Sequence, residues 1–314
     1  MSFASEVKKE ILAIDDISKC CKRALVFGIL QGTAEITISN GIKLTIKSSI
    51  LNVIKSVVAF LKDEYNIHID ESLQIAKNSL GRKYYYLEIK ENAREIIKDF
   101  SLMPYDDIDL DHPFIKKDCC KNAFVRGMFA SKGSINDPRK ECYHFEINCK
   151  KDSVAETIQS ILKEKEIIAK LSAKGNNTLL YVKKSEHISN CLALIGANSG
   201  IFYFEDSRIY RDFVNTANRL SNCDVANARR SASSCEKQLA IIQLIRDYGY
   251  FEKMPIRLQS IARMREEYPD SSLEELSEFS DKMFGKTLSK SGISHCMRDL
   301  VSYYESLKRV CKKF

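Results

Sequence analysis

Residues 20–36 read Cys20-Cys21-Lys22-Arg23-Ala24-Leu25-Val26-Phe27-Gly28-Ile29-Leu30-Gln31-Gly32-Thr33-Ala34-Glu35-Ile36, and residues 119–135 read Cys119-Cys120-Lys121-Asn122-Ala123-Phe124-Val125-Arg126-Gly127-Met128-Phe129-Ala130-Ser131-Lys132-Gly133-Ser134-Ile135. The two stretches align without a gap at an offset of 99 residues, and seven of their 17 positions are identical. Chance would give about one identity at ordinary residue frequencies. The chain therefore contains an internal duplication, and we expect each copy to build the same structural unit.

The repeated stretch predicts a buried helix with a glycine in its middle. Residues 24–30 are almost wholly apolar, which is typical of a helix that is covered on most sides. A glycine inside a helix costs about 1 kcal/mol relative to alanine. Because Gly28 and Gly127 stand at the same point of the two copies, we expect two helix backbones to approach each other too closely for a Cβ atom.

The elements that follow each copy also repeat. The periodicity predicts helix, two strands, helix, two strands and helix in each half. In the first half we expect strands at 35–38 and 42–47 around Ser39-Asn40-Gly41, a helix at 49–65, a hairpin around Asn78-Ser79-Leu80-Gly81 and a helix at 93–100. In the second half we expect a turn at Asn136-Asp137-Pro138, a strand at 142–149, a helix at 153–165, strands at 167–172 and 178–182, and a helix at 186–194.

This element order, with its glycine-bearing helices, resembles the LAGLIDADG homing-endonuclease fold over about residues 19–200. The resemblance implies a pseudo-twofold axis through the paired helices and two saddle-shaped sheets. In that family an acidic residue near the end of each motif helix holds Mg²⁺ for phosphodiester hydrolysis. Those positions carry Thr33 and Lys132 here, Glu35 is two residues out of phase, and its counterpart is Ser134. The resemblance therefore implies the fold without the cleavage chemistry, and an active homing-type endonuclease is the disfavoured alternative.

Composition and cysteine spacing narrow the class of protein. The 314 residues are 44% hydrophobic and carry a net charge of +7, which is typical of an ordinary globular chain of about two domains. No apolar run is long enough for a membrane span, and the N-terminus lacks the core of a signal peptide. We therefore expect a cytoplasmic protein with neither a membrane partner nor a small-molecule substrate.

The eleven cysteines include no Cys-x-x-Cys motif, and no histidine stands at a usual zinc spacing from a cysteine pair. We accordingly expect reduced thiols that pack as small hydrophobic residues, with no metal and no cofactor. The histidines at positions 68, 112, 144 and 187 are scattered through different predicted elements and suggest no catalytic group.

Basic and aromatic residues of the first half are candidates for contact with DNA or protein. They are Lys43, Lys47, Arg82, Lys83 and the run Tyr84–Tyr86. An ordinary solvated face with strand aromatics explains them equally well. Farther along, residues 207–232 form a helical stretch with five arginines and two aspartates, in which Arg219, Arg229 and Arg230 are candidates for phosphate contact. The alternative is a solvated connector helix.

The last 79 residues predict a helical domain. Ser272 and Glu275 form a capping box at the start of a short helix at 273–279, and a loop at 280–288 with Gly285 leads to a last helix that continues to Leu307. This pattern indicates a helix-turn-helix over about Ser272–Leu307.

Charge supports the same interpretation of this domain. Residues 266–281 hold seven acids and no base, whereas residues 282–314 hold eight bases and two acids. Because recognition helices contact bases with their N-terminal residues, the candidate DNA-binding residues are Lys286, Ser289, Lys290, Ser291, Ser294, His295 and Arg298. A three-helix domain that binds protein is the alternative.

Further motifs resemble the WhiA family over essentially the full length. They are Ser2-Phe3-Ala4-Ser5-Glu6-Val7-Lys8, the two Cys-Cys pairs, Gly127, Phe204-Glu205-Asp206, Asn215, Asn218-Arg219, Asn222-Cys223, Ala226-Asn227, Pro269-Asp270-Ser271-Ser272-Leu273-Glu274-Glu275-Leu276 and Leu288-Ser289-Lys290-Ser291-Gly292.

The resemblance implies an α+β protein with three parts: a degenerate LAGLIDADG-like domain at 1–205 with repeats at about 19–100 and 118–200, a basic helical linker at 206–235, and an all-α helix-turn-helix domain at 236–314. It also implies a bacterial, nucleoid-associated transcriptional regulator that binds double-stranded DNA and is linked to cell division, chromosome segregation or sporulation. An adaptor that binds another regulatory protein through its first domain remains the alternative.

Overall fold

The computed structural model describes residues 2–14, 18–38, 41–67, 73–77, 81, 83–140 and 142–311. The chain divides into two compact units, Met1–Asp212 and Phe213–Phe314. Each unit has a hydrophobic core of its own. The turn residues 39–40 and 78–80, together with Arg82 and His68, lie outside the described residues.

The first unit contains two copies of one motif after the N-terminal helix α1, Phe3–Leu12. The first copy consists of α2 (Lys19–Thr33), β1 (Ala34–Thr37), β2 (Lys43–Ser48), α3 (Leu51–Tyr65), β3 (Leu73–Lys77), β4 (Lys83–Ile89) and α4 (Ala93–Asp99). The second copy consists of α5 (Asp118–Lys132), β5 (Gly133–Ile135), β6 (Phe145–Cys149), α6 (Asp152–Glu164), β7 (Lys170–Lys174), β8 (Asn177–Val182) and α7 (Ser185–Ile195). Each copy builds an antiparallel four-stranded sheet, ordered β1-β2-β4-β3 in the first and β5-β6-β8-β7 in the second. The predicted duplicated α+β fold is confirmed.

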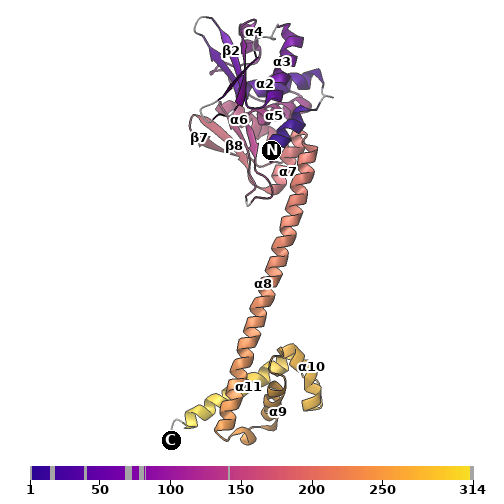
Figure 1. The fold of residues 1–314 in the computed structure, drawn as a ribbon, viewed down its shortest axis with the longest axis vertical. Helices are drawn as coiled ribbons and strands as arrows, with labels where there is room; N and C mark the ends of the chain where they lie inside the picture. The colour runs from indigo at the N-terminus through magenta and orange to yellow at the C-terminus, as the bar shows by residue number, and fades with distance from the viewer. Residues whose placement is uncertain are drawn as a thin grey trace. The chain divides into compact units, whose positions relative to one another are not determined.

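Helices α2 and α5 pack against each other at the centre of this unit (Figure 1). Both helices begin and end at positions that are 99 residues apart, so the offset found in the sequence holds for the whole element. A Cβ atom on Gly28 would lie 2.3 Å from the carbonyl oxygen of Phe124, and one on Gly127 would lie 2.1 Å from that of Leu25. Both distances are far below van der Waals contact, which confirms that the glycines permit a close approach of two backbones.

Both sheets alternate between a buried and an outward face. In β2 the side chains of Leu44 and Ile46 are fully buried, and in β6 those of Phe145 and Ile147 are fully buried. Intervening residues such as Lys47 point away from the core, because successive strand residues face opposite sides.

Two boundaries in the second copy differ from the prediction. Strand β5 follows α5 directly, whereas the sequence pattern suggested only a turn at 136–138. Strand β6 begins at Phe145 rather than at residue 142. The three residues of β5 are too few for a periodic pattern, and the strand is recognisable only because it pairs with β6 in the register Gly133↔Ile147.

The second unit contains one turn of 3-10 helix and several α-helices. Helix α8 (Asn198–Asp247) begins in the first unit and continues into the second, followed by η1 (Phe251–Lys253), α9 (Ile256–Glu267), α10 (Leu273–Phe284) and α11 (Lys290–Cys311). The basic stretch at 206–235 is helical as expected, but it is the middle of α8 and not a separate element. Helix α10 is five residues longer than predicted.

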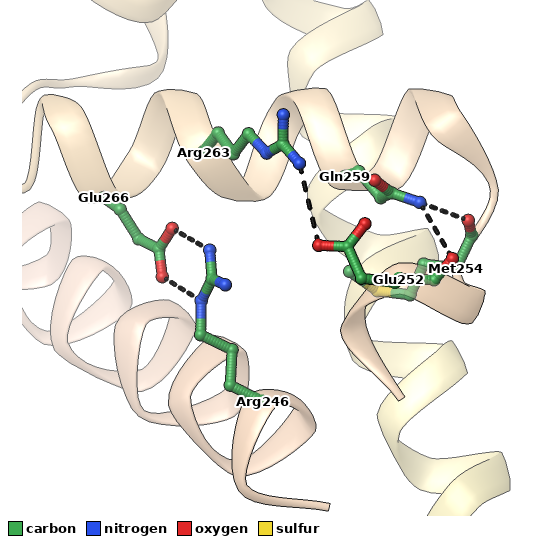
Figure 2. A network of polar contacts seen from close by, with 6 residues as sticks. All are labelled: Arg246, Glu252, Met254, Gln259, Arg263 and Glu266. Carbon is green, nitrogen blue, oxygen red and sulfur yellow. Dashed lines mark hydrogen bonds and ion pairs between the residues drawn. The ribbon is translucent and has the colours of Figure 1, made fainter. Parts of the chain in front are cut away.

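A network of polar contacts fixes the end of α8 to α9 (Figure 2). Arg246 donates from Nε and Nη2 to the two carboxylate oxygens of Glu266 at 2.9 and 2.8 Å. The Arg246 guanidinium also lies 3.6 Å from the centre of the Phe251 ring. Gln259 donates to the backbone carbonyl of Met254 at 2.9 Å, which holds the residues between the two helices. Two parallel charge-assisted hydrogen bonds are directional, so this pair specifies the angle at which α8 meets α9.

Candidate nucleic-acid interface

The turn between α10 and α11 is built from serine side chains. Helix α10 begins with the predicted capping box, in which Ser272 Oγ accepts from the Glu275 amide at 3.2 Å and Glu275 accepts from the Ser272 amide at 2.6 Å. It ends at Gly285, whose φ of +62° is a conformation that favours glycine. Ser280 is fully buried and accepts from the Leu288 amide at 2.7 Å. This bond ties the turn back onto α10 and sets where α11 starts.

Helix α11 has one buried and one exposed face. Ile293, Met297 and Leu300 lie in the core of the second unit. His295 and Arg298 are exposed. The structure therefore places these two candidate residues on the outward face of α11, as the periodicity predicted.

A groove of about 610 Å³ lies in the second unit beside α11. Its lining combines α8, Arg265 of α9, the start of α10 and the first three turns of α11. Four of the predicted DNA-binding residues are brought together there, namely Arg230, Lys290, Ser294 and Arg298. Three of these four carry a positive charge, so the groove is suited to an anionic backbone.

The groove also contains polar residues of α8. Asn227 belongs to a motif named in the sequence analysis, whereas Ser231, Ser234 and Gln238 were missed there. Their spacing of three and four residues places them on one face of a helix. The periodic spacing of these polar residues is visible in the sequence. Their place in a groove could not be predicted, because it depends on the packing of α11 beside α8.

The buried side chain of Arg265 lines the bottom of the same groove. Its side chain is 1% exposed, and its Nη1 donates to the carbonyl of Ser271 at 2.6 Å and to that of Tyr268 at 3.3 Å. Burial lowers the pKa of its guanidinium from the ordinary value. These bonds satisfy the carbonyls of the connection between α9 and α10, so Arg265 holds the wall of the groove in place.

The other candidates in the second unit have local roles or lie elsewhere. Ser289 accepts from the Gly292 amide at 3.2 Å and so caps α11. His295 Nδ1 lies 2.8 Å from the Asp299 carboxylate. Arg219 and Arg229 are exposed on α8 but do not line the groove, and Lys286 is exposed in the turn before α11.

Lys290 and Ser291 stand in the first turn of α11. The Lys290 ammonium lies 2.9 Å from the Glu274 carboxylate of α10, in an exposed pair that an incoming phosphate can replace at little cost. The Ser291 hydroxyl lies 3.0 Å from that of Ser289.

The paired helices of the first unit end in a buried threonine and an exposed lysine. Thr33 is 2% exposed and donates to the Ile29 carbonyl at 2.7 Å inside its own helix. Lys132 is exposed at the end of α5 and repels two other lysines, Lys8 and Lys150. We call Lys8, Lys132 and Lys150 the lysine cluster.

Burial first, and Lys132 second, lower the pKa of both other members of this cluster. The pKa of Lys8 falls to about 8. Lys150 extends from the second copy to donate to the Ala34 carbonyl of the first at 2.7 Å. Positive charge therefore gathers at the ends of the paired helices, with the Glu35 carboxylate as a neighbouring opposite charge.

The outward sheet face of the first copy has mixed charge. Lys47 lies 2.5 Å from the Glu35 carboxylate, and Lys43 lies 3.4 Å from that of Glu88. Tyr86 is the register partner of Lys47 and donates to Gln74. Because acids accompany these bases, the described residues of this face do not form the single-sign field that attracts DNA from a distance.

The two Cys-Cys pairs of the duplication meet at the other end of the paired helices. Six of the ten described cysteines are buried, as expected for small hydrophobic side chains. Cys20, Cys21, Cys119 and Cys120 nevertheless lie together, which the spacing of the cysteines along the chain did not indicate. Among the described residues, no helix combines the length and hydropathy needed to span a membrane.

Comparison with known proteins identifies similarities to both units. Residues 121–214 match the model of the WhiA LAGLIDADG-like domain, and residues 217–304 match that of the WhiA C-terminal HTH domain. A protein of Oceanobacillus iheyensis named probable cell division protein WhiA is 32% identical, with 98% of each chain covered. A protein of the same name from Shouchella clausii is 31% identical, covering 98% of this chain and 95% of its own.

A solved structure has the same fold over the full length. It is the crystal structure of full-length DUF199/WhiA from Thermatoga maritima, which matches with a TM-score of 0.59 and 22% identity and covers 98% of this chain and 99% of its own. This likeness supports the arrangement of elements described above.

Proposed function

Since the chain belongs to the WhiA family, we propose that it is a non-enzymatic, sequence-specific DNA-binding regulator that acts in cell division. The relatives' name supplies the process, and the helix-turn-helix domain supplies the chemistry. The observation that carries the proposal is the convergence of Arg230, Lys290 and Arg298 on one groove beside α11. Binding to duplex DNA would associate the protein with the nucleoid.

In this proposal α11 enters the major groove and α8 contacts the backbone. The exposed guanidinium of Arg298 is suited to the O6 and N7 atoms of guanine, which accept two parallel hydrogen bonds. Ser294 and His295 contact base edges or phosphate. Lys290, Lys286 and Arg230 contact phosphate. The capping hydroxyl of Ser289 and the neighbouring hydroxyl of Ser291 lie where a phosphate would meet the start of the helix.

In this proposal each of the three domains has a different role in DNA binding. We assign DNA reading to residues 236–314 and backbone contact to the basic helical residues 206–235, where Arg219 and Arg229 extend the positive face of α8. The LAGLIDADG-like residues 1–205 provide a second contact with phosphate through the lysine cluster. Neither Thr33 nor Lys132 can hold Mg²⁺, so this contact would be one of binding and not of hydrolysis.

The test is selection of bound duplexes from a random pool and from genomic fragments, with the full-length protein. We expect one enriched motif and an affinity that falls with salt, with a slope in log K against log salt of about −3 or steeper, because Lys286, Lys290 and Arg230 alone would contact three phosphates. Lys290→Ala should make that slope shallower by about 1. As a control, Lys253→Ala removes a charge of η1, outside the groove, and should leave the slope unchanged.

Two outcomes would replace the proposal. A full-length protein that selects no duplex, yet retains a regulatory protein in affinity purification, would be an adaptor. Metal-dependent nicking of duplex DNA that is abolished by Glu35→Gln would make it a nuclease.

A further inference from the structure

Four cysteines gather where the two paired helices begin. Cys20 and Cys21 lie in the first turn of α2, and Cys119 and Cys120 lie in the first turn of α5. The Sγ atoms of all four lie within 4.8 Å of one another. Each copy of the duplication contributes one pair, and the packing of α2 on α5 brings the pairs together.

We propose that these four thiols bind one Zn²⁺ ion as a tetrathiolate site that links the two copies. A Zn–S bond of about 2.3 Å places the sulfurs of a tetrahedral site about 3.8 Å apart. Cys119 Sγ and Cys120 Sγ already lie 3.9 Å apart, and no separation among the four exceeds 4.8 Å. Rotation of the cysteine side chains would bring the sulfur atoms to the separation of a tetrahedral zinc site. Four soft sulfur ligands favour zinc over cations that prefer oxygen, such as Mg²⁺ or Ca²⁺.

Burial raises the pKa of the Cys21 and Cys120 thiols, but two features beside the cluster would stabilise thiolates on a bound cation. Neither α2 nor α5 has a side chain that caps its N-terminus, so the positive ends of two helix dipoles lie at the first turns that hold the four cysteines. The Ser18 hydroxyl lies 3.2 Å from Cys20 Sγ and can donate to a bound thiolate. Binding converts Zn²⁺ and four thiols into a complex of charge −2 and releases four protons, and the two helix ends stabilise that charge.

The cluster is partly exposed to solvent and partly buried. Cys119 is exposed and Cys20 partly exposed, whereas Cys21 and Cys120 are buried. An ion can therefore enter from solvent and be held against the core. All four are free thiols, and they form one compact group and not two separate bonded pairs. This arrangement suits a shared ligand better than a disulfide.

The experiment uses the full-length protein purified under reducing conditions. Elemental analysis should find about one zinc per chain. Replacement by Co²⁺ should produce intense sulfur-to-cobalt charge-transfer absorption and the strong visible bands of a tetrahedral site. The variant that tests the ligands is Cys20→Ser/Cys119→Ser, which changes the two more accessible thiols. Cys142→Ser is the matched control, because Cys142 is an exposed cysteine of the same unit that lies outside the cluster.

We expect the double variant to bind Co²⁺ at least about 100-fold more weakly than the unchanged protein, and Cys142→Ser to bind it equally well. The proposal is overturned by a reduced protein with neither stoichiometric zinc nor the cobalt spectrum. Equal metal content in the double variant, or a disulfide among the four under reducing conditions, would also overturn it. If the double variant does not fold, the metal content and cobalt spectrum of the unchanged protein decide the question alone.

Discussion

Gly28 and Gly127 face each other across the contact between α2 and α5. A Cβ atom on Gly28 would lie 3.2 Å from the carbonyl carbon of Gly127 and 2.3 Å from the carbonyl oxygen of Phe124. The atoms it would meet belong to the backbone of the facing helix, so they cannot move aside as a side-chain tip can. The duplicated glycine therefore sets the distance between the two halves of the first unit.

Gly127→Ala should lower the free energy of unfolding of the first unit by at least about 2 kcal/mol, because the added methyl group forces the helices apart. Denaturant unfolding followed by circular dichroism would measure the effect. Gly292→Ala is the control, since its Cβ atom would meet nothing closer than 3.4 Å. We expect this control not to lower stability, and to raise it by up to about 1 kcal/mol, because alanine is favoured over glycine in a helix. Equal stability of Gly127→Ala and the unchanged protein would contradict the role of the glycine pair.

Arg298→Ala should weaken binding to the selected DNA site by about 1–3 kcal/mol and relax the preference at one base pair. The fold should be unaffected, because the side chain is exposed on α11. Fluorescence anisotropy with a set of single-substitution duplexes would measure both changes. A uniform loss across all duplexes would make Arg298 a phosphate contact, and an unchanged profile would remove it from the interface.

Ser280→Ala should lower the stability of the second unit by about 1–3 kcal/mol, because the Leu288 amide loses its buried acceptor. The same change should weaken DNA binding, since Leu288 leads directly into α11. Ser306→Ala provides the comparison, because Ser306 is exposed on α11 and its hydroxyl donates locally to the Tyr303 carbonyl. If both variants unfold at the same denaturant concentration, the Ser280 bond does not anchor the turn.

Local patterns in the sequence predicted much of the fold. The capping box at Ser272 and Glu275 correctly marked the start of α10, and the duplicated glycines correctly indicated paired helices. The continuity of α8 was also readable, because residues 201–248 contain neither glycine nor proline. The end of α10 was not predicted, because Ser280 resembles a turn residue and its role as a buried acceptor depends on a tertiary contact.

The sites were harder to predict than the elements. Spacing rules for metal ligands assume that neighbouring cysteines belong to one segment, whereas Cys21 and Cys120 meet only because α2 packs on α5. The groove raised the same difficulty, since Arg230 and Arg298 are 68 positions apart in the sequence and meet only in the packed unit. The duplication was the available signal for the cysteines: equivalent residues near a pseudo-twofold axis are expected to meet.

Lys8 should make stability depend on pH. Burial, and then repulsion from Lys132, lower the pKa of Lys8 from the ordinary 10.5 to about 8 in the folded protein. Between these values the unfolded chain binds the proton and the folded chain does not, so stability rises with pH from about 8 to 10.5. Below pH 8 the folded state carries the full cost of a charged, partly buried lysine.

Lys8→Met should therefore stabilise the protein at pH 7 by about 1–2 kcal/mol and remove this rise, while Lys9→Met on the exposed side of α1 should keep it. Urea unfolding at several pH values gives the free energy of unfolding of each variant. The titration of other groups cancels in the difference between variants. Lys132→Gln should narrow the pH range over which stability rises, because the pKa of Lys8 increases when the neighbouring charge is removed. If Lys132→Gln leaves the pH dependence unchanged, the lysine cluster is not electrostatically coupled, and the phosphate contact proposed for it loses its support.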